Sequence, residues 1–236
     1  MTEKLLSGRV AVVTGASRGL GAAAAVALAE AGAHVVLVAR TVGGLEAVDD
    51  KIQAIGGSAT LVPLDLMELE KIDALAGSLH GRFGRTDILV GNAGMLGALT
   101  PVAHLDPKTW DKLLALNVTV NARLIRAFEP LLRASDAGRA IFVTAGVARK
   151  PEAYWGPYAA TKAALEALAR SWALELERTA VKVNLLDPGA VATGLRAQAF
   201  PGEPAGHASD PAKLAPLFLD LASPACRRHG QIVNAF

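Results

Sequence analysis

The chain has 236 residues, of which 52% are hydrophobic and 19% are charged. This composition excludes a largely disordered chain, and the length suits one α/β domain with a large buried core, so we expect a single domain over residues 1–236. The 24 Lys and Arg residues against 22 Asp and Glu leave a formal net charge of +2. The basic residues are not clustered as nucleic-acid binding requires, and we expect no nucleic-acid partner.

The high hydrophobic content does not predict a membrane protein. The longest nearly uninterrupted apolar stretch, Ala22 to Ala29, is far shorter than the roughly 20 residues of a membrane-spanning helix. The opening residues show no secretory pattern, and the single cysteine, Cys226, excludes an internal disulfide framework. The five histidines have no metal-ligand spacing. We therefore expect a cytoplasmic protein with no membrane partner and no metal site.

Short runs rich in β-branched residues alternate with alanine- and leucine-rich stretches along the whole chain. We predict strands at 9–14, 34–39, 59–64, 87–90, 140–144, 181–186 and 231–234, and helices at 20–31, 42–55, 68–83, 107–133, 154–178 and 211–221. Most of these strands are apolar on both faces, which is typical of a parallel sheet covered by helices on both sides. The predicted fold is therefore α/β, a Rossmann-type doubly wound parallel sheet of about seven strands.

One stretch, 193–209, lacks a clear period and contains two prolines and three glycines. We predict an irregular loop there, and in a compact domain loops of this length often form lids or substrate-binding segments.

A glycine-rich turn follows the first predicted strand, with glycines at 15, 19 and 21 in the sequence TGASRGLG. Glycine permits a tight turn and lets a phosphate approach the backbone, and the helix that starts here presents free N–H groups to a pyrophosphate. The spacing is not the common G-x-G-x-x-G, and a turn that only connects strand to helix is the alternative. Given the strand-turn-helix context, we favour a dinucleotide site.

The residues after the second strand bear on which dinucleotide binds. An NAD enzyme places an acid here for the ribose 2′-hydroxyl, whereas this chain has Ala39 and Arg40. Arg40 is able to pair with a 2′-phosphate, and Arg18 in the glycine turn lies on the same side. We predict NADP(H) in preference to NAD(H), although a solvated strand-end Arg40 is the alternative.

Tyr158 and Lys162 lie four residues apart near the start of a predicted helix, and therefore on one face. A neighbouring ammonium, with a nicotinamide cation beside it, favours the phenolate and lowers the pKa of a tyrosine. Such a phenol can give a proton to a carbonyl oxygen or take one from an alcohol. The pair alone occurs often by accident, but its combination with the glycine turn favours catalysis.

At this point the chain resembles the short-chain dehydrogenase/reductase family over essentially its whole length. The glycine turn, Asp65-Leu66, Asn92-Ala93-Gly94, Asn117, Tyr158-x-x-x-Lys162 and Pro188-Gly189-x-Val191-x-Thr193 match six family motifs in order. The resemblance implies catalytic roles for Asn117, Tyr158 and Lys162, with Asn117 holding a water in a proton relay to the lysine. The residues expected to contact the cofactor are Gly15, Ser17, Arg18, Gly19, Leu20, Gly21, Arg40, Asp65, Leu66, Asn92, Ala93, Gly94, Tyr158, Lys162, Pro188, Gly189, Val191 and Thr193.

One family residue is missing. The family places a serine thirteen residues before the tyrosine, where it hydrogen-bonds the substrate carbonyl, and this chain has Ala145 there. Loss of such a donor can cost about 100- to 1,000-fold in turnover. Three interpretations stay open: Thr144 substitutes for the serine, Tyr154 does, or Ala145 is an engineered change that slows catalysis.

The sequence therefore favours an oxidoreductase that transfers hydride between NADP(H) and a carbonyl or secondary alcohol, with a small-molecule substrate. The alternative is an NADP(H)-binding sensor or regulatory protein with little or no turnover. We expect Trp155, with Met95, Leu96, Leu195 and Phe200, to line an apolar substrate cleft. Trp110, Trp155 and Trp172 lie in helices that usually form the family's subunit interface, where core packing is the alternative, and a homodimer or homotetramer is expected.

Overall fold

The computed structural model describes residues 4–235, and within them seven parallel strands form one sheet in the order β3-β2-β1-β4-β5-β6-β7. The strands are β1 (Val10–Thr14), β2 (His34–Ala39), β3 (Ser58–Pro63), β4 (Ile88–Gly91), β5 (Arg139–Val143), β6 (Lys182–Asp187) and β7 (Ile232–Asn234). The order reverses between β1 and β4, the place where ligands bind in such sheets. The predicted doubly wound α/β fold is confirmed.

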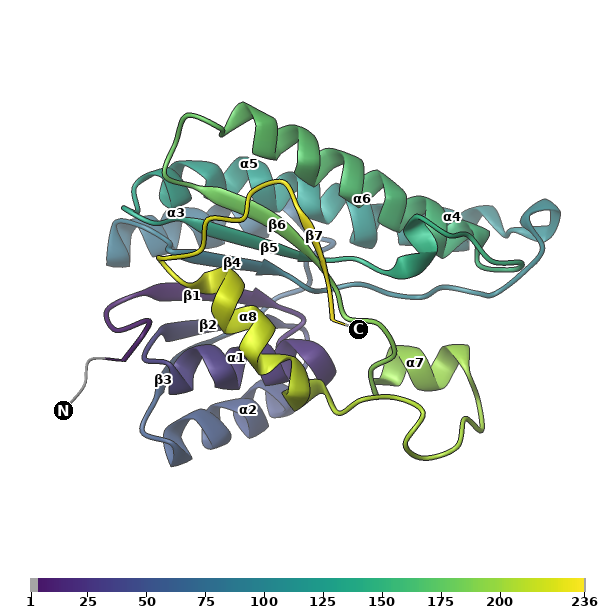
Figure 1. Ribbon diagram of the computed structural model, residues 1–236, viewed down its shortest axis with the longest axis horizontal. Coiled ribbons are helices and arrows are strands. Elements are labelled where there is room, and N and C mark those ends of the chain that lie inside the picture. The colour runs from purple at the N-terminus through teal and green to yellow at the C-terminus, as the bar shows by residue number, and fades with distance from the viewer. Residues whose placement is uncertain (1–3, 236) are drawn as a thin grey trace.

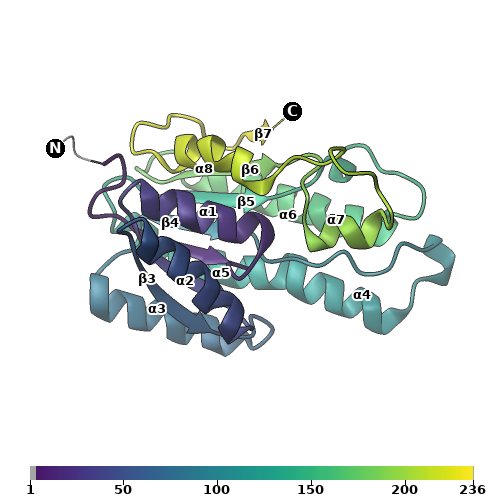
Figure 2. The ribbon, with the colours of Figure 1, turned by 90° about the horizontal axis from the view of Figure 1, so that it is seen from below.

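Helices cover both faces of the sheet (Figures 1 and 2). One layer contains α1 (Gly19–Glu30), α2 (Val42–Ala54) and α8 (Ala215–Ala222), and the other contains α3 (Leu69–Phe83), α4 (Pro107–Leu114), α5 (Val120–Arg133) and α6 (Gly156–Glu175). A short helix, α7 (Gly194–Ala199), lies apart from both layers, near the C-terminal end of the sheet (Figure 1). Single turns are η1 (Val102–His104), η3 (Gly146–Ala148) and η4 (Pro211–Leu214).

The side chains of each strand point alternately to the two faces of the sheet, and each face therefore has its own hydrophobic core. In β1, Ala11 and Val13 pack with the layer of α1, whereas Val10 and Val12 pack with the layer of α3, α5 and α6. Side chains alternate between the two faces of a strand, so a strand buried on both sides is apolar at every position. This double burial accounts for much of the high hydrophobic content.

The long predicted helix 107–133 is interrupted. Asp106 caps its start by accepting a hydrogen bond from the Thr109 amide at 2.8 Å, as the sequence predicts for an Asp-Pro pair. A π-helical segment, η2 (Ala115–Thr119), then separates α4 from α5. Such bulges are often found at functional sites, and no propensity signal in the sequence marks this one.

Two other predicted boundaries are wrong. The 193–209 segment is not wholly irregular, because Thr193 caps α7 by accepting from the Arg196 amide at 3.2 Å. The helix predicted from residue 154 begins at Gly156, because Tyr154 has a φ of +72°, which no α-helix accommodates.

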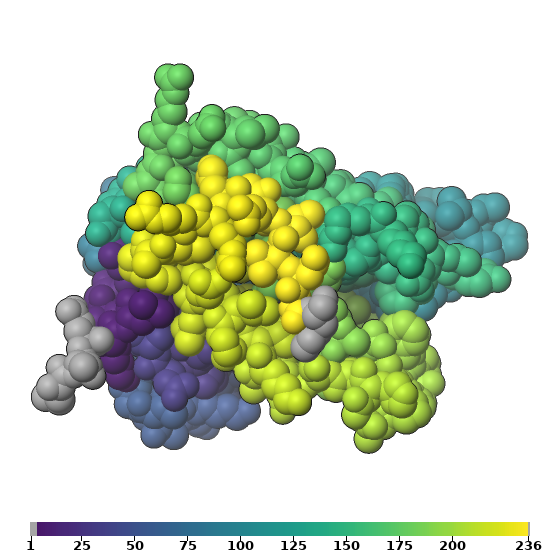
Figure 3. Space-filling view, in the orientation of Figure 1, coloured from purple at the N-terminus to yellow at the C-terminus, as the bar shows by residue number. Residues whose placement is uncertain are grey.

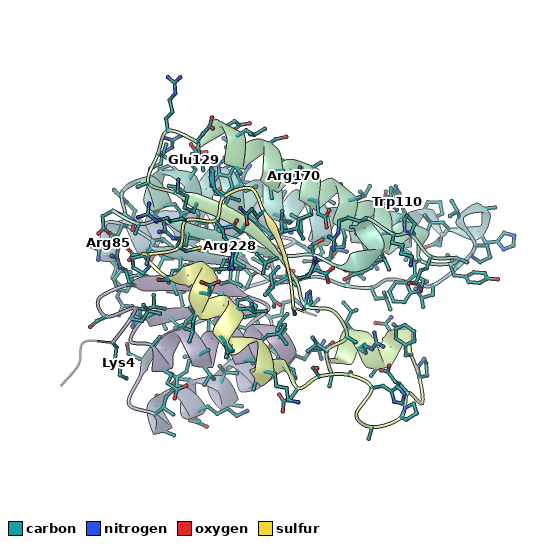
Figure 4. All side chains as sticks on the ribbon, viewed as in Figure 1. Lys4, Arg85, Trp110, Glu129, Arg170 and Arg228 are labelled. Atoms are coloured by element: carbon teal, nitrogen blue, oxygen red, sulfur yellow. The ribbon has the colours of Figure 1, made fainter. Side chains whose placement is uncertain are left out.

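Of the tryptophans expected at a subunit interface, Trp172 belongs to the core. Its ring is 2% exposed and packs edge-on against Phe142, and its indole N–H donates to Glu129 at 2.8 Å. Figure 4 labels Glu129 together with Arg170 and Trp110 on the layer formed by α4, α5 and α6. Trp172 therefore ties α5 to α6 from inside this layer.

Within residues 4–235, no helix is both long and apolar enough to cross a membrane. Nor does the same part of the chain bring three or more His, Cys, Asp or Glu residues together as metal ligands.

Candidate active site

A cleft of about 660 Å³ opens at the carboxyl ends of β1 to β6. In Figure 3 a notch separates the lobe formed by the 193–209 region from the part of the chain above it. Of the catalytic and cofactor-binding residues that the sequence predicts, all but Gly21 and Asn117 line this cleft. The topology thus gathers segments from six strand ends, which are far apart in the sequence, around one cavity.

The glycine turn after β1 uses its glycines for different purposes. Gly15 and Gly19 have φ values of +65° and +57°, a region that favours glycine. Gly21 does not line the cleft; a Cβ there would overlap the carbonyl oxygen of Gly15 and the Asn92 side chain. Gly21 therefore lets α1 pack closely beneath the turn.

The N-terminus of α1 suits a pyrophosphate. Its first turn carries neither an acidic residue nor a side-chain cap among the described residues. The backbone N–H groups of that turn are therefore free to bind an anion, with the helix dipole in support. Asn92 fixes the turn from behind, because its amide donates to the Thr14 carbonyl at 2.9 Å and its backbone N–H donates to the Thr14 hydroxyl at 2.9 Å.

Arg18 and Arg40 both line the cleft and are exposed. Neither forms an ion pair with any carboxylate within residues 4–235. Two unpaired guanidinium groups flanking the end of β2 create a positive region at the place where a 2′-phosphate would lie. Asp65 and Leu66 line the same end of the cleft, and Asp65 accepts a hydrogen bond from the Met67 amide at 3.0 Å.

Tyr158 and Lys162 lie on the face of α6 that borders the cleft. The lysine ammonium is 5.7 Å from the centre of the tyrosine ring and donates to the Val143 carbonyl at 2.8 Å. Both side chains are nearly buried, with exposed fractions of 6% for Tyr158 and 4% for Lys162. The predicted pair is therefore close together and largely removed from water.

Burial and neighbouring charges shift the pKa values of this pair. Burial lowers the pKa of Lys162 to about 8, against the opposing effect of Glu166. Burial, together with the Asp187 carboxylate, raises the pKa of Tyr158 above its ordinary value. The expected lowering of the Tyr158 pKa requires a nicotinamide cation beside the lysine and stays a prediction. Among the groups of the chain itself, burial and Asp187 act in the opposite direction.

Asn117 lies in the π-helical segment η2 and does not line the cleft. Its side chain exchanges two hydrogen bonds with the Met95 backbone, both at 2.9 Å, and donates to the Thr161 hydroxyl at 3.0 Å. Its backbone carbonyl accepts a hydrogen bond from Asn121 at 2.9 Å. Asn117 therefore holds the segment after β4 against α6, and its role in a proton relay stays a prediction.

Ala145 lines the cleft, and neither alternative hydroxyl replaces the missing serine in this arrangement. Thr144 is 1% exposed, and its hydroxyl donates to Glu166 at 2.7 Å. Tyr154 is 59% exposed and is not among the cleft-lining residues. The side-chain donor that the family places here is therefore absent from the described geometry.

The 193–209 segment packs over the cleft. Phe200 stacks on Trp155 with ring centres 5.7 Å apart, and Arg196 lies over Phe200 and pairs with Glu203 at 2.5 Å. Gln198 donates to the carbonyl of Gly97 at 3.0 Å on the opposite side. These contacts hold the segment in one ordered position at the entrance.

The predicted apolar wall is correct only in part. Trp155, Leu195 and Phe200 line the cleft, whereas Met95 and Leu96 do not. Leu96 is 2% exposed and belongs to the interior. The backbone of Met95 is bonded to the Asn117 side chain by two hydrogen bonds of 2.9 Å.

Several lining residues were not predicted, among them Leu116, Glu152 and Asp187. Asp187 precedes the Pro188-Gly189 pair at the end of β6, so its strand-end position was an available signal. Arg149 was not among the predicted site residues, yet it pairs with two buried carboxylates, Glu166 and Asp187. No local pattern marks that three-residue contact, because its members are distant in the sequence.

This geometry defines a dinucleotide-binding oxidoreductase of the Rossmann class, and comparison with known proteins identifies the family. The family model for short chain dehydrogenases matches residues 9–204. The oxidoreductase YciK of Escherichia coli strain K12 is 36% identical over 229 residues, which cover 96% of this chain and 90% of that protein. The chain therefore belongs to the short-chain dehydrogenase/reductase family of oxidoreductases.

Solved structures of short chain dehydrogenases superpose closely on this chain. A short chain dehydrogenase from Pseudomonas syringae superposes with a TM-score of 0.96 at 39% identity, covering 100% of this chain and 97% of that one. A short chain dehydrogenase from Shigella flexneri 2a strain 301, complexed with NADP, superposes with a TM-score of 0.94 at 35% identity and covers 99% of each chain.

Proposed function

We propose that the protein is an NADP(H)-dependent oxidoreductase acting on a carbonyl compound or the corresponding secondary alcohol. The observation that carries this proposal is the convergence of Tyr158, Lys162 and the uncapped start of α1 on one cleft. The cofactor, when bound, exchanges a hydride with the substrate carbon. Tyr158 gives or takes the proton at the substrate oxygen, and Lys162 stabilises its phenolate form.

Arg18 and Arg40 support NADP(H) over NAD(H). Both line the cleft, both lack a carboxylate partner within residues 4–235, and the second strand ends without an acid that would repel a 2′-phosphate. The NADP complex of the similar Shigella chain points in the same direction.

Ala145 favours a second candidate, an NADP(H)-binding sensor with little or no turnover. The cleft has no side-chain hydroxyl beside Tyr158 at this position, and the hydroxyl of Thr144 is engaged with Glu166. Retention of Tyr158 and Lys162 in buried, adjacent positions favours the enzyme, because cofactor binding alone does not require a proton donor.

The test is NADPH oxidation by the purified protein with a panel of ketones and aldehydes, beside a direct measurement of NADPH binding. The enzyme proposal predicts turnover that falls by about 100-fold or more in Tyr158→Phe, with NADPH affinity retained. Tight NADPH binding without turnover on any member of the panel would instead support the sensor.

Ala145→Ser sharpens the comparison. A serine hydroxyl at this position is expected to increase turnover by up to about 100- to 1,000-fold, the contribution of one pre-organised donor. No gain on any carbonyl that the parent accepts would show that the missing hydroxyl does not limit the reaction.

We also propose that the 193–209 segment selects the substrate. Its Leu195 and Phe200 join Trp155 in an apolar wall, which suits an uncharged, fairly hydrophobic carbonyl compound. Phe200→Ala should raise the KM for bulky apolar ketones more than the KM for small ones. An equal effect on both would remove this assignment.

A further inference from the structure

A group of charged side chains lies directly behind Ala145. Arg149, which follows η3, pairs through one guanidinium nitrogen with Glu166 of α6 and through another with Asp187 at the end of β6. Thr144 donates to the same oxygen of Glu166 at 2.7 Å. We call Thr144, Arg149, Glu166 and Asp187 the Arg149 network.

The network is built into the protein interior rather than laid on its surface. The carboxylate side chains of Glu166 and Asp187 are 9% and 10% exposed, and that of Arg149 is 35% exposed. Arg149 also donates to Asn234 of β7 at 3.3 Å, and the Gly189 amide donates to Asp187 at 3.1 Å. When two partly buried carboxylates share one arginine, removal of the arginine leaves both of their charges uncompensated, which is costly.

The two carboxylates of the Arg149 network each influence one member of the catalytic pair. Tyr158, Lys162 and Glu166 succeed one another at four-residue intervals on α6, so they share one face of the helix. The charge of Glu166 acts on Lys162, and that of Asp187 acts on Tyr158. Positive and negative groups thus alternate from Lys162 through Glu166, Arg149 and Asp187.

We propose that Arg149 is a positioning residue that holds Glu166 and Asp187 in place and neutralises their charges beside Lys162 and Tyr158. This inference rests on the proposed function, since it assigns a purpose to the environment of the catalytic tyrosine. It also explains why Arg149 does not offer its charge to a substrate: both ends of its guanidinium group are already engaged.

The physical argument concerns the charge that Tyr158 experiences when it ionises. Asp187 and Lys162 line the same cleft as Tyr158, and the Lys162 ammonium is 5.7 Å from the centre of the tyrosine ring. The other charged residues that line this cleft are Arg18, Arg40, Asp65, Glu152 and Arg196. With Arg149 present, part of the negative charge of Asp187 is offset by the ion pair. Without Arg149, an uncompensated carboxylate opposes a second negative charge on Tyr158, and an interaction of this kind typically shifts a pKa by about 1 unit or more.

The chain offers a direct measurement, because Tyr154 and Tyr158 are its only tyrosines. In a Tyr154→Phe background, tyrosine labelled with ¹³C at Cζ reports Tyr158 alone. The carbon signal is followed from pH 8 to the pH at which circular dichroism detects unfolding. This readout requires neither cofactor nor turnover, so its failure is separate from failure of the proposed function.

In that background, Arg149→Met should move ionisation of Tyr158 to higher pH by about 1 unit, and adding Asp187→Asn should reverse the shift. Asp187→Asn alone should move ionisation to lower pH, because Arg149 then keeps an excess positive charge. Arg149→Lys, which retains the charge but cannot bridge two carboxylates, should lie between Arg149→Met and the background protein.

Arg133→Met is the matched control, because Arg133 pairs with Glu129 on the surface of α5, away from the cleft. It should titrate like the background protein. Unchanged Tyr158 ionisation in Arg149→Met would overturn the proposal. If Arg149→Met does not fold, or if the background protein unfolds before Tyr158 ionises, the Asp187→Asn variant provides the test. If Tyr158 in that variant does not ionise at a lower pH than in the background protein, the neutralising role is refuted.

Discussion

Arg139→Met tests how the segment that follows α8 is attached to the sheet. Arg139 opens the central strand β5 and is 3% exposed, yet it has no carboxylate partner within residues 4–235. Its guanidinium group donates instead to five backbone carbonyls, those of Gly138, Ala180, Ser223, Pro224 and Cys226, at 2.7 to 3.4 Å. Three of these carbonyls belong to the segment that follows α8, so one side chain anchors that segment to β5.

The expected cost follows from these contacts. A hydrogen bond from a charged donor contributes about 1.5 to 3 kcal/mol, but losses within one cluster are not additive. Methionine keeps much of the apolar stem and leaves the carbonyls of Ala180, Pro224 and Cys226 without this donor, whereas those of Gly138 and Ser223 still accept from a backbone N–H. We expect a loss of about 3 to 5 kcal/mol in the free energy of unfolding, a large share of the roughly 5 to 15 kcal/mol typical of a folded protein.

Urea unfolding monitored by circular dichroism measures this loss, and the melting temperature should fall by about 6 to 20 °C. Arg133→Met, which removes one partly exposed ion pair, is the control and should cost under about 1 kcal/mol. A loss below about 1 kcal/mol in Arg139→Met would refute the reasoning, because it would show that water replaces the guanidinium group at little cost.

Three further changes test other parts of the structure. Arg40→Asp should weaken NADPH binding by roughly 10- to 100-fold and NADH binding far less, and equal losses in calorimetric titrations of both cofactors would contradict the 2′-phosphate assignment. Gly21→Ala should reduce NADPH affinity strongly, since its Cβ would overlap the Gly15 carbonyl and the Asn92 amide; unchanged affinity would show that the turn adjusts freely. His229 accepts from a β6 amide at 3.1 Å and is 2.7 Å from an α6 carbonyl, and burial lowers its pKa below the ordinary 6.5. Its neutral form is therefore the one that the folded state favours, so stability should be complete above pH 6.5 and fall as the pH drops toward the folded-state pKa. His229→Gln should flatten that fall, and an identical pH profile of urea midpoints would exclude His229 as its cause.

Much of this protein is determined by short-range pattern. Strands that are apolar at every position require cover on both faces, so alternation of strands and helices predicts the doubly wound sheet. A parallel sheet brings the residues after its strands to one edge. The glycine turn, Arg40 and Asp65 were therefore predictable members of a single site.

The spacing of Tyr158 and Lys162 was also sufficient to place them together, because residues four apart share a helix face. Spacing says nothing about their surroundings, however. The direction of the Tyr158 pKa shift depends on burial and on Asp187, which lies 29 positions later in the chain. Desolvation is a property of the packed interior, and no local pattern contains it.

Other features were decided only by the tertiary structure. No local pattern in the sequence marks the π-helical segment that contains Asn117, the position of Met95 and Leu96 outside the cleft, or the left-handed backbone of Tyr154. The contacts of Arg149 and Arg139 are of the same kind. Neither arginine was predicted to have such a role. Its role follows from carboxylates or carbonyls that the folded chain brings to it, and all of these partners except the Gly138 carbonyl are 17 to 87 residues away.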